Sequence, residues 1–136
     1  FKDLPPGDHF ITIREVNDVL IHIPPGYNST TPFPIVIALH GMGENYAVNF
    51  RNEINLQQLS DREGFITVYA LGSESWSTAL FGHSWNAGTC CFSSADDKAY
   101  LLEVIKQIKG NKKNKKRFSC SEFLKNCYAR MKLKFI

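Results

Sequence analysis

The order of hydrophobic and polar positions along the chain predicts several short strands separated by turns and helices. Residues 10–16 alternate between apolar and polar side chains, and residues 19–23 form a short β-branched run after a polar turn. Together they predict a two-stranded hairpin. Residues 35–39 and 65–70 form nearly continuous apolar runs, a pattern typical of parallel strands that are buried on both faces.

Helices are predicted on either side of the second apolar run. Residues 53–63 carry spaced leucine and isoleucine side chains among polar ones, and the segment stops at Gly64, a residue suited to the left-handed position after a helix. A second helix is predicted to begin at Ser94, which can cap it, and to end at Gly110. The order strand, helix, strand is that of a right-handed parallel crossover, so the pattern predicts an α/β fold.

Charge divides the chain near the end of the second predicted helix. Residues 1–105 carry 5 Lys/Arg against 12 Asp/Glu, a net charge of −7, whereas residues 106–136 carry 11 against 1, a net charge of +10. We therefore expect one α/β domain over residues 1–110 and a basic, poorly patterned tail over residues 111–136. Positive charge confined to a tail argues against a nucleic-acid-binding domain. No apolar run reaches the roughly 18 residues that a membrane span requires, so no membrane span is expected.

The turn that follows the first apolar run is the strongest candidate for chemistry. His40, Gly41, Met42 and Gly43 come directly after a predicted buried strand. Glycines permit a sharp turn and a close substrate approach, so main-chain N–H groups here can point outward and form an oxyanion hole. A flexible strand-to-loop turn explains the same four residues about as well, and both readings stay open.

Four segments, in order, resemble the polyhydroxybutyrate depolymerase and feruloyl esterase-like family of α/β-hydrolases. They are residues 23–27 (IPPGY), 34–41 (PIVIALHG), 64–69 (GFITVY) and 84–91 (SWNAGTCC), the last followed by the DDKAY of residues 96–100. The SWNAGTCC segment is the most specific of them. The resemblance implies a partial α/β-hydrolase fold, in which an N-terminal hairpin is followed by parallel strands with crossover helices.

The same resemblance implies a secreted, extracellular serine hydrolase that cleaves small or polymeric carboxylic esters. The family's oxyanion loop maps onto residues 40–43, with the Met42 N–H as the expected donor. Trp85 and Asn86 map onto a loop beside the acyl pocket and are candidate substrate-binding residues. A buried tryptophan and a turn-forming asparagine are equally good explanations of these two residues.

The nucleophile of the family is missing, and we identify no catalytic residue. No Gly-x-Ser-x-Gly elbow is present; the nearest imitation, around Ser84, has Asn86 in place of the final glycine. We therefore expect an N-terminal part of an esterase that is truncated and inactive as this chain, so enzyme status is uncertain. The alternatives are a non-catalytic module that binds an ester or a glycan, and an unstable fragment without function.

The remaining candidate features concern location and metal binding. The chain has four cysteines, Cys90, Cys91, Cys120 and Cys127, and their pairing stays open. Asn28 begins a glycosylation sequon, which together with the cysteines favours an oxidising compartment. The histidines and cysteines show no metal-binding spacing, so we expect neither a metal site nor a cofactor.

Overall fold

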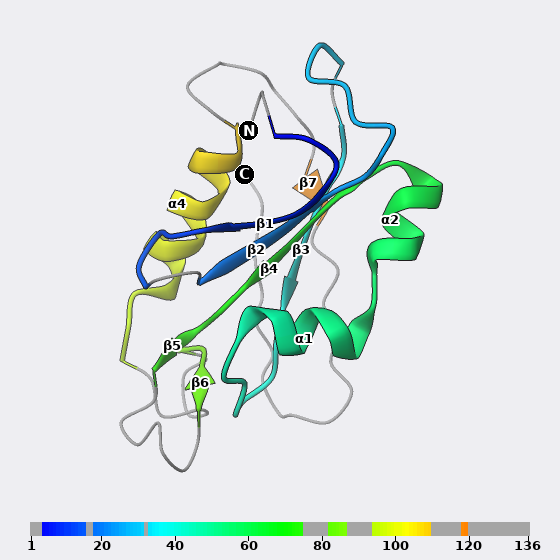
Figure 1. Ribbon diagram of the computed structural model, residues 1–136. Helices are drawn as coiled ribbons and strands as arrows, with labels where there is room; N and C mark the ends of the chain where they lie inside the picture. The colour runs from blue at the N-terminus through cyan, green and yellow to red at the C-terminus, as the bar shows by residue number, and fades with distance from the viewer. Residues whose placement is uncertain are drawn as a thin grey trace.

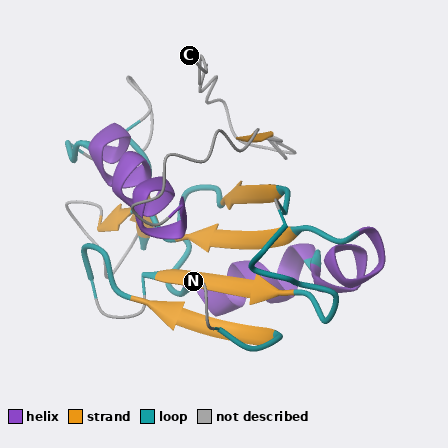
Figure 2. Ribbon diagram, turned by 90° about the horizontal axis from the view of Figure 1, so that it is seen from above, coloured by secondary structure: helices purple, strands orange, loops and turns teal. Residues whose placement is uncertain are grey.

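The structure, a computed structural model, describes residues 4–15, 18–31, 33–74, 82–86, 94–109 and 118–119. Its centre is a mixed five-stranded sheet, whose strands are, in spatial order, β1 (Gly7–Ile11), β2 (Val19–Ile23), β4 (Ile66–Ala70), β3 (Ile35–Leu39) and β7 (Phe118–Ser119). Helix α4 (Asp97–Lys109) covers one face, while α1 (Ala47–Ile54) and α2 (Gln57–Glu63) lie on the other (Figures 1 and 2). The expected α/β class is confirmed as a small mixed α/β protein.

The predicted N-terminal hairpin is present, with its first strand shifted toward the N-terminus. β1 and β2 pair antiparallel, but β1 ends at Ile11, whereas the prediction placed the strand over residues 10–16. The reason is the carboxylate of Asp18, which accepts hydrogen bonds from the main-chain N–H groups of Ile13 and Arg14 at 2.8 and 2.9 Å. These amides therefore close the turn and do not extend the ladder.

The two continuous apolar runs form the parallel pair at the centre of the sheet. β3 and β4 run parallel, with Ile35 opposite Ile66 and Leu39 opposite Ala70. Every residue of β4 is buried, as a strand covered on both faces requires. Because parallel neighbours end at the same edge, the residues that follow Leu39 and Ala70 emerge side by side.

The connection between β3 and β4 contains two helices, whereas the sequence predicted one over residues 53–63. Helix α1 ends at Asn55, which separates it from α2. Asn55 adopts the left-handed conformation with φ 43°, and its N–H donates to the Arg51 carbonyl. Asparagine tolerates this conformation better than most residues, which explains the break. The predicted end at Gly64 is confirmed: its φ is 73°, and its N–H donates to the Ser60 carbonyl at 2.9 Å.

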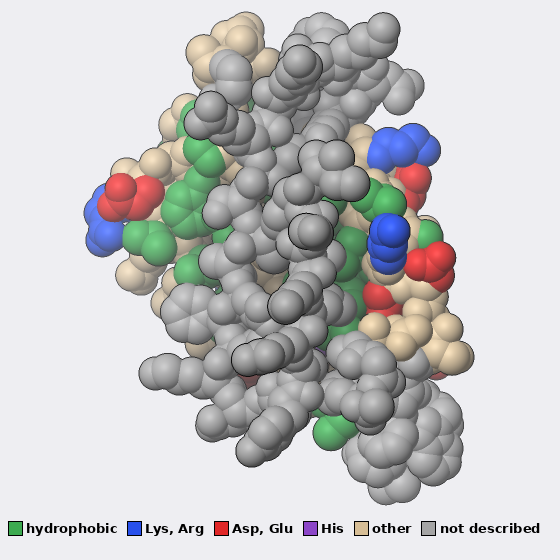
Figure 3. Space-filling model, turned by 180° about the vertical axis from the view of Figure 1, so that it is seen from behind, with side chains coloured by type: hydrophobic (Ala, Val, Ile, Leu, Met, Phe, Trp, Pro, Cys, Tyr) green, Lys and Arg blue, Asp and Glu red, His purple; other side chains and the backbone are tan. Residues whose placement is uncertain are grey.

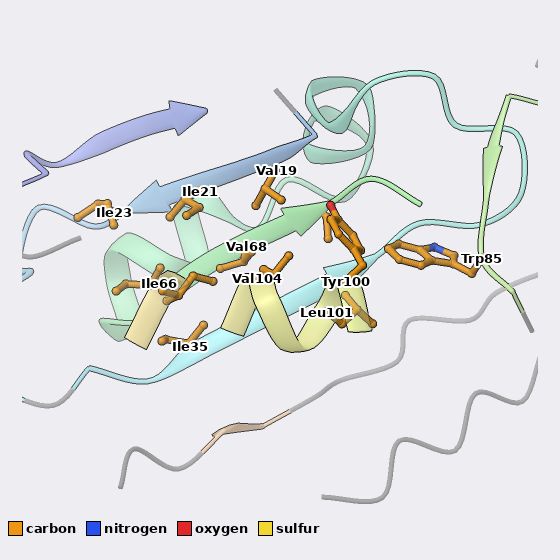
Figure 4. Packing of buried hydrophobic residues seen from close by; sticks show 12 residues of the cluster. Val19, Ile21, Ile23, Ile35, Ile66, Val68, Trp85, Tyr100, Leu101 and Val104 are labelled. Atoms are coloured by element: carbon orange, nitrogen blue, oxygen red, sulfur yellow. The ribbon is translucent and has the colours of Figure 1, made fainter. Parts of the chain in front are cut away.

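The larger part of the core lies between the sheet and α4. Figure 4 shows aliphatic side chains of the strands facing those of the helix, with Tyr100 and Trp85 at the end of the core near the carboxyl end of β4. Val104, at the centre of α4, has no exposed surface. The buried members of this cluster are Val19, Ile21, Ile23, Ile35, Ile66, Val68, Ala70, Trp85, Tyr100, Leu101, Val104 and Ile108.

Three short strands lie in segments for which no strand was predicted. Within the loop expected over residues 72–94, β5 (Ser73–Glu74) and β6 (His83–Ser84) pair antiparallel. Within the expected tail, β7 pairs parallel with the beginning of β3. One short strand of the sheet is therefore contributed by residues 111–136.

On the face shown in Figure 3, charged side chains lie at the two lateral margins and hydrophobic ones nearer the middle. Within the described residues, no helix combines the length and apolar character needed to cross a membrane.

Truncation of one side chain tests the packing of α4. Leu101 is 6% exposed and packs in the core, so Leu101→Ala is expected to lower the free energy of unfolding by about 3 kcal/mol through lost apolar burial and a cavity. Leu102→Ala is the matched control, because the neighbouring side chain is 56% exposed. Urea unfolding measures both variants; equal losses would contradict the described orientation of the helix.

Candidate functional site

The candidate site lies at the edge where the parallel strands β3 and β4 end. In open α/β sheets, ligands bind outside the carboxyl ends of the strands. Residues 40–44 leave β3 at this edge and meet the β5–β6 hairpin, because Glu44 forms an isolated antiparallel bridge with His83. The predicted oxyanion segment is therefore anchored against a second segment far along the chain.

His40 is a structural side chain at the base of this loop. It is 4% exposed, and its Nε2 accepts a hydrogen bond from the main-chain N–H of Gly72 at 2.8 Å. Its Nδ1 faces the Gly41 carbonyl oxygen, which can only accept, so the proton of the neutral ring is on Nδ1. Burial lowers the pKa of His40 to about 4, although the hydrogen bond to the Gly41 carbonyl opposes this shift.

Gly72, the partner of His40, leaves no room for a larger residue. A Cβ added there would overlap the carbonyl group of Ser84 and would lie 3.3 Å from the Nε2 atom of His40. The absence of a side chain at Gly72 thus permits the close approach of the loop after β4, the β5–β6 hairpin and the His40 ring.

Trp85 belongs to the same buried cluster. Its Nε1 donates to the His40 carbonyl oxygen at 2.9 Å, and its ring packs between those of His40 and Tyr100, with centroid distances of 5.2 and 6.3 Å (Figure 4). Only 6% of the residue is exposed. These contacts are those of the buried tryptophan that the sequence left open as the alternative, and the ring presents no face to a ligand here.

Asn86, the other candidate substrate-binding residue, is exposed and braces the start of α4. Its main-chain N–H donates to the buried carboxylate of Asp97, and its side-chain amide donates to the Ala95 carbonyl at 3.0 Å. Asp97 also pairs with Arg14 at 3.1 Å, and the Arg14 guanidinium lies 4.1 Å from the centre of the Tyr100 ring. The described contacts of Asn86 are therefore structural.

Some main-chain N–H groups of the glycine turn, residues 40–43, donate hydrogen bonds within the described residues, and others do not. The Gly43 N–H donates to the His83 carbonyl oxygen at 3.0 Å, and the His83 N–H donates back to the Glu44 carbonyl oxygen. Within the described part of the chain, no group accepts a hydrogen bond from the Met42 N–H. Both Gly41 and Met42 are exposed. Among the described residues, the N–H groups of Gly41 and Met42 thus have no acceptor, whereas that of Gly43 is bonded to His83.

The sequon residue Asn28 lies in an exposed turn after β2. Its side-chain oxygen accepts hydrogen bonds from the N–H and hydroxyl groups of Thr30 at 2.9 and 2.8 Å. Its position is open to water, as glycosylation requires, and the modification itself stays a prediction. The cysteines Cys90, Cys91, Cys120 and Cys127 lie outside the described residues.

Two histidine clusters were missed by the sequence analysis. His22 lies between two carboxylates, with its Nδ1 2.6 Å from Asp8 and its Nε2 2.9 Å from Asp61. His83 lies against Glu15, with 3.3 Å between its Nε2 and the carboxylate. In each cluster the partners come from separate elements, so no local spacing in the sequence marks them.

Comparison of the chain with models of known protein families finds no match, and comparison with curated protein sequences finds none either. The geometry of the strand-end loop and the motifs in the sequence are therefore the basis for the functional argument.

The buried state of His40 makes a pH-dependent prediction. Because its folded-state pKa, about 4, lies below the value of 6.5 for an unperturbed histidine, the unfolded chain binds the proton more tightly. The free energy of unfolding should therefore fall as the pH decreases from 6.5 to 4, with about 3 kcal/mol attributable to this residue.

Urea unfolding between pH 4 and 8 measures this dependence. In His40→Gln, which has no titrating ring, the fall should be smaller by that amount. In His9→Gln, which removes a histidine at the sheet margin bonded to Pro5, the fall should persist. An unchanged pH dependence in His40→Gln would contradict the described burial of the ring.

Proposed function

We propose that this chain is the N-terminal part of a carboxylic ester hydrolase of the α/β-hydrolase class, similar to polyhydroxybutyrate depolymerases and feruloyl esterases. Its contribution is one donor of an oxyanion hole, the main-chain N–H of Met42. The substrate class is a small or polymeric carboxylic ester, and the proposed location is extracellular.

The single observation that carries the proposal is the open amide of Met42 at the carboxyl edge of the parallel strands. Ester hydrolysis passes through a tetrahedral intermediate whose oxygen carries negative charge, and preorganised N–H donors stabilise that charge. The Met42 amide meets the requirements of such a donor, since Gly41 and Met42 are exposed, while the His40 side chain on one side of them and the Gly43 N–H on the other are held by hydrogen bonds.

The arrangement of the sheet supports the same proposal. An antiparallel hairpin precedes a parallel pair, and helices α1 and α2 connect the parallel strands. This is the arrangement expected for the N-terminal part of an α/β-hydrolase. The helix α4 and the parallel strand β7 follow in the order in which that family places the helix and strand before its nucleophile.

The chain as given supplies the oxyanion side of this chemistry without a nucleophile elbow. No Gly-x-Ser-x-Gly is present in the 136 residues, and Ser84, the remote candidate, has no exposed surface. We therefore expect no ester turnover from this chain. The alternative function, a module that holds an ester or glycan on Trp85, is favoured by no observation, because that ring is buried.

Titration with phenylphosphonate, an anionic tetrahedral analogue, tests the proposed donor by ¹H–¹⁵N NMR. The Met42 amide is expected to show a saturable downfield shift, because a phosphonyl oxygen accepts its proton, while the Gly43 amide stays bonded to His83 and changes little. Met42→Pro removes the donor and should abolish saturable binding of phenylphosphonate, followed at the ³¹P resonance of the ligand; Met42→Leu keeps the N–H and should retain it. In a complete serine hydrolase, losing one such donor costs roughly 10²–10³ in kcat.

Two results would count against the proposal. One is binding that is unchanged in Met42→Pro. The other is hydrolysis of p-nitrophenyl acetate by this chain that Ser84→Ala abolishes, because it would place the nucleophile where the proposal has none.

A further inference from the structure

Three side chains that the proposed ester site does not use converge beside the β5–β6 hairpin. They are Glu15, in the loop after β1, Glu74 of β5 and His83 of β6, and one ligand atom from each lies within 4.8 Å of the other two. Glu74 and His83 are directly opposite each other across the hairpin. The fold therefore brings together a histidine and two carboxylates from three separate segments.

The ring of His83 is held in the orientation that a metal ligand needs. Its Nδ1 lies 3.1 Å from the main-chain carbonyl oxygen of Glu44, which can only accept a hydrogen bond, so the proton belongs on Nδ1. The Nε2 is then directed toward the carboxylates and lies 3.3 Å from Glu15. Donation from one ring nitrogen to a carbonyl is the usual outer-shell support of a histidine whose other nitrogen binds a metal.

Charge at the cluster is unbalanced without a cation. Among the ion pairs of the described residues, neither Glu15 nor Glu74 has a lysine or arginine partner. Two carboxylates this close repel each other, and solvent screens this repulsion in part, since Glu74 is exposed and the Glu15 side chain is 36% exposed, whereas the side chain of His83 is 12% exposed. With the proton on Nδ1, the Nε2 lone pair of His83 also points toward the carboxylates.

From this geometry we propose that Glu15, Glu74 and His83 bind a divalent transition-metal ion of the zinc class. An imidazole nitrogen favours Zn²⁺ over Ca²⁺ or Mg²⁺, which prefer oxygen ligands alone. Three protein ligands are one fewer than the tetrahedral set, so water completes the coordination. The bound ion links Glu15, in the loop after β1, to Glu74 and His83 of the β5–β6 hairpin. It stabilises the edge of the sheet independently of ester chemistry.

A protonated His83 is the competing explanation of the same contacts. In that case its Nε2–H donates to Glu15, the pair is complete, and Glu74 contributes nothing. Glu74→Gln therefore separates the two explanations, because it removes one metal ligand while it leaves the contact between His83 and Glu15 intact.

Calorimetric titration of the untagged, chelator-treated chain with ZnCl₂, together with thermal melting, tests the site. The proposal expects a zinc-dependent rise in Tm that EDTA reverses. It also expects a loss of affinity of roughly tenfold or more in Glu74→Gln and in Glu15→Gln, at least the scale seen when an outer-shell partner is removed. Glu63→Gln is the matched control, since that exposed glutamate on α2 pairs with Arg62, and its affinity should equal that of the unmodified chain.

Several results would overturn the proposal. They are the absence of a zinc-dependent rise in Tm, a rise of the same size in Glu74→Gln, which would place the ion elsewhere in the chain, and an equal response to MgCl₂. Because Glu15→Gln and Glu74→Gln each remove one carboxylate, failure of either variant to fold leaves the other to decide.

Discussion

The hydrogen bond from the Gly72 N–H to the Nε2 of His40 is the contact on which the architecture of the strand-end region depends. It joins the residue that follows β3 to the loop that follows β4, at the edge where both strands end. The bond requires a neutral ring, since a protonated His40 has no acceptor to offer. Burial supplies that condition by lowering the pKa of the ring to about 4. The core and the loop are thus coupled through the protonation state of one side chain.

His40 also connects the strand-end region to helix α4. Its carbonyl oxygen accepts the Trp85 Nε1–H, and Trp85 in turn packs on Tyr100, so the segment around residue 85 is fixed against helix α4. The His40 Nε2, the Trp85 Nε1 and the Tyr100 hydroxyl each have a defined hydrogen-bond partner, which gives such networks their specificity. Beyond His40, the turn is tied again at Gly43 through His83. Met42 lies between these two anchors with an amide that no described group uses.

The sequence predicts those parts of the fold that local patterns determine. The parallel strands β3 and β4 follow from the continuous apolar runs over residues 35–39 and 65–70, although only β4 is buried at every position. The hairpin strand over residues 19–23 follows from its β-branched run, and the end of α2 at Gly64 follows from the left-handed preference of glycine. Helix α1 was missed because it buries only Ala47 and Phe50 and therefore has a weak apolar face.

Features that depend on contacts between distant segments could not be predicted from local sequence patterns. The early end of β1 depends on the Asp18 carboxylate, and the burial of Trp85 depends on a carbonyl group 45 residues away. The cluster around His83 draws its members from three segments, so no spacing in the sequence indicates it. The strand-end turn itself was predicted, because glycines directly after an apolar strand are a local signal. The sequence did not predict that the Gly43 N–H is occupied, because its acceptor, the His83 carbonyl oxygen, lies 40 residues along the chain.

Native-state hydrogen exchange of single amides, followed by NMR, tests most directly the claim that the turn is anchored at both ends and open between them. The Gly72 amide, bonded to a buried histidine, and the Gly43 amide, bonded to His83, should exchange slowly. The Met42 amide should exchange near the rate of an unstructured chain. Protection of Met42 equal to that of Gly43, or rapid exchange at Gly72, would contradict the account.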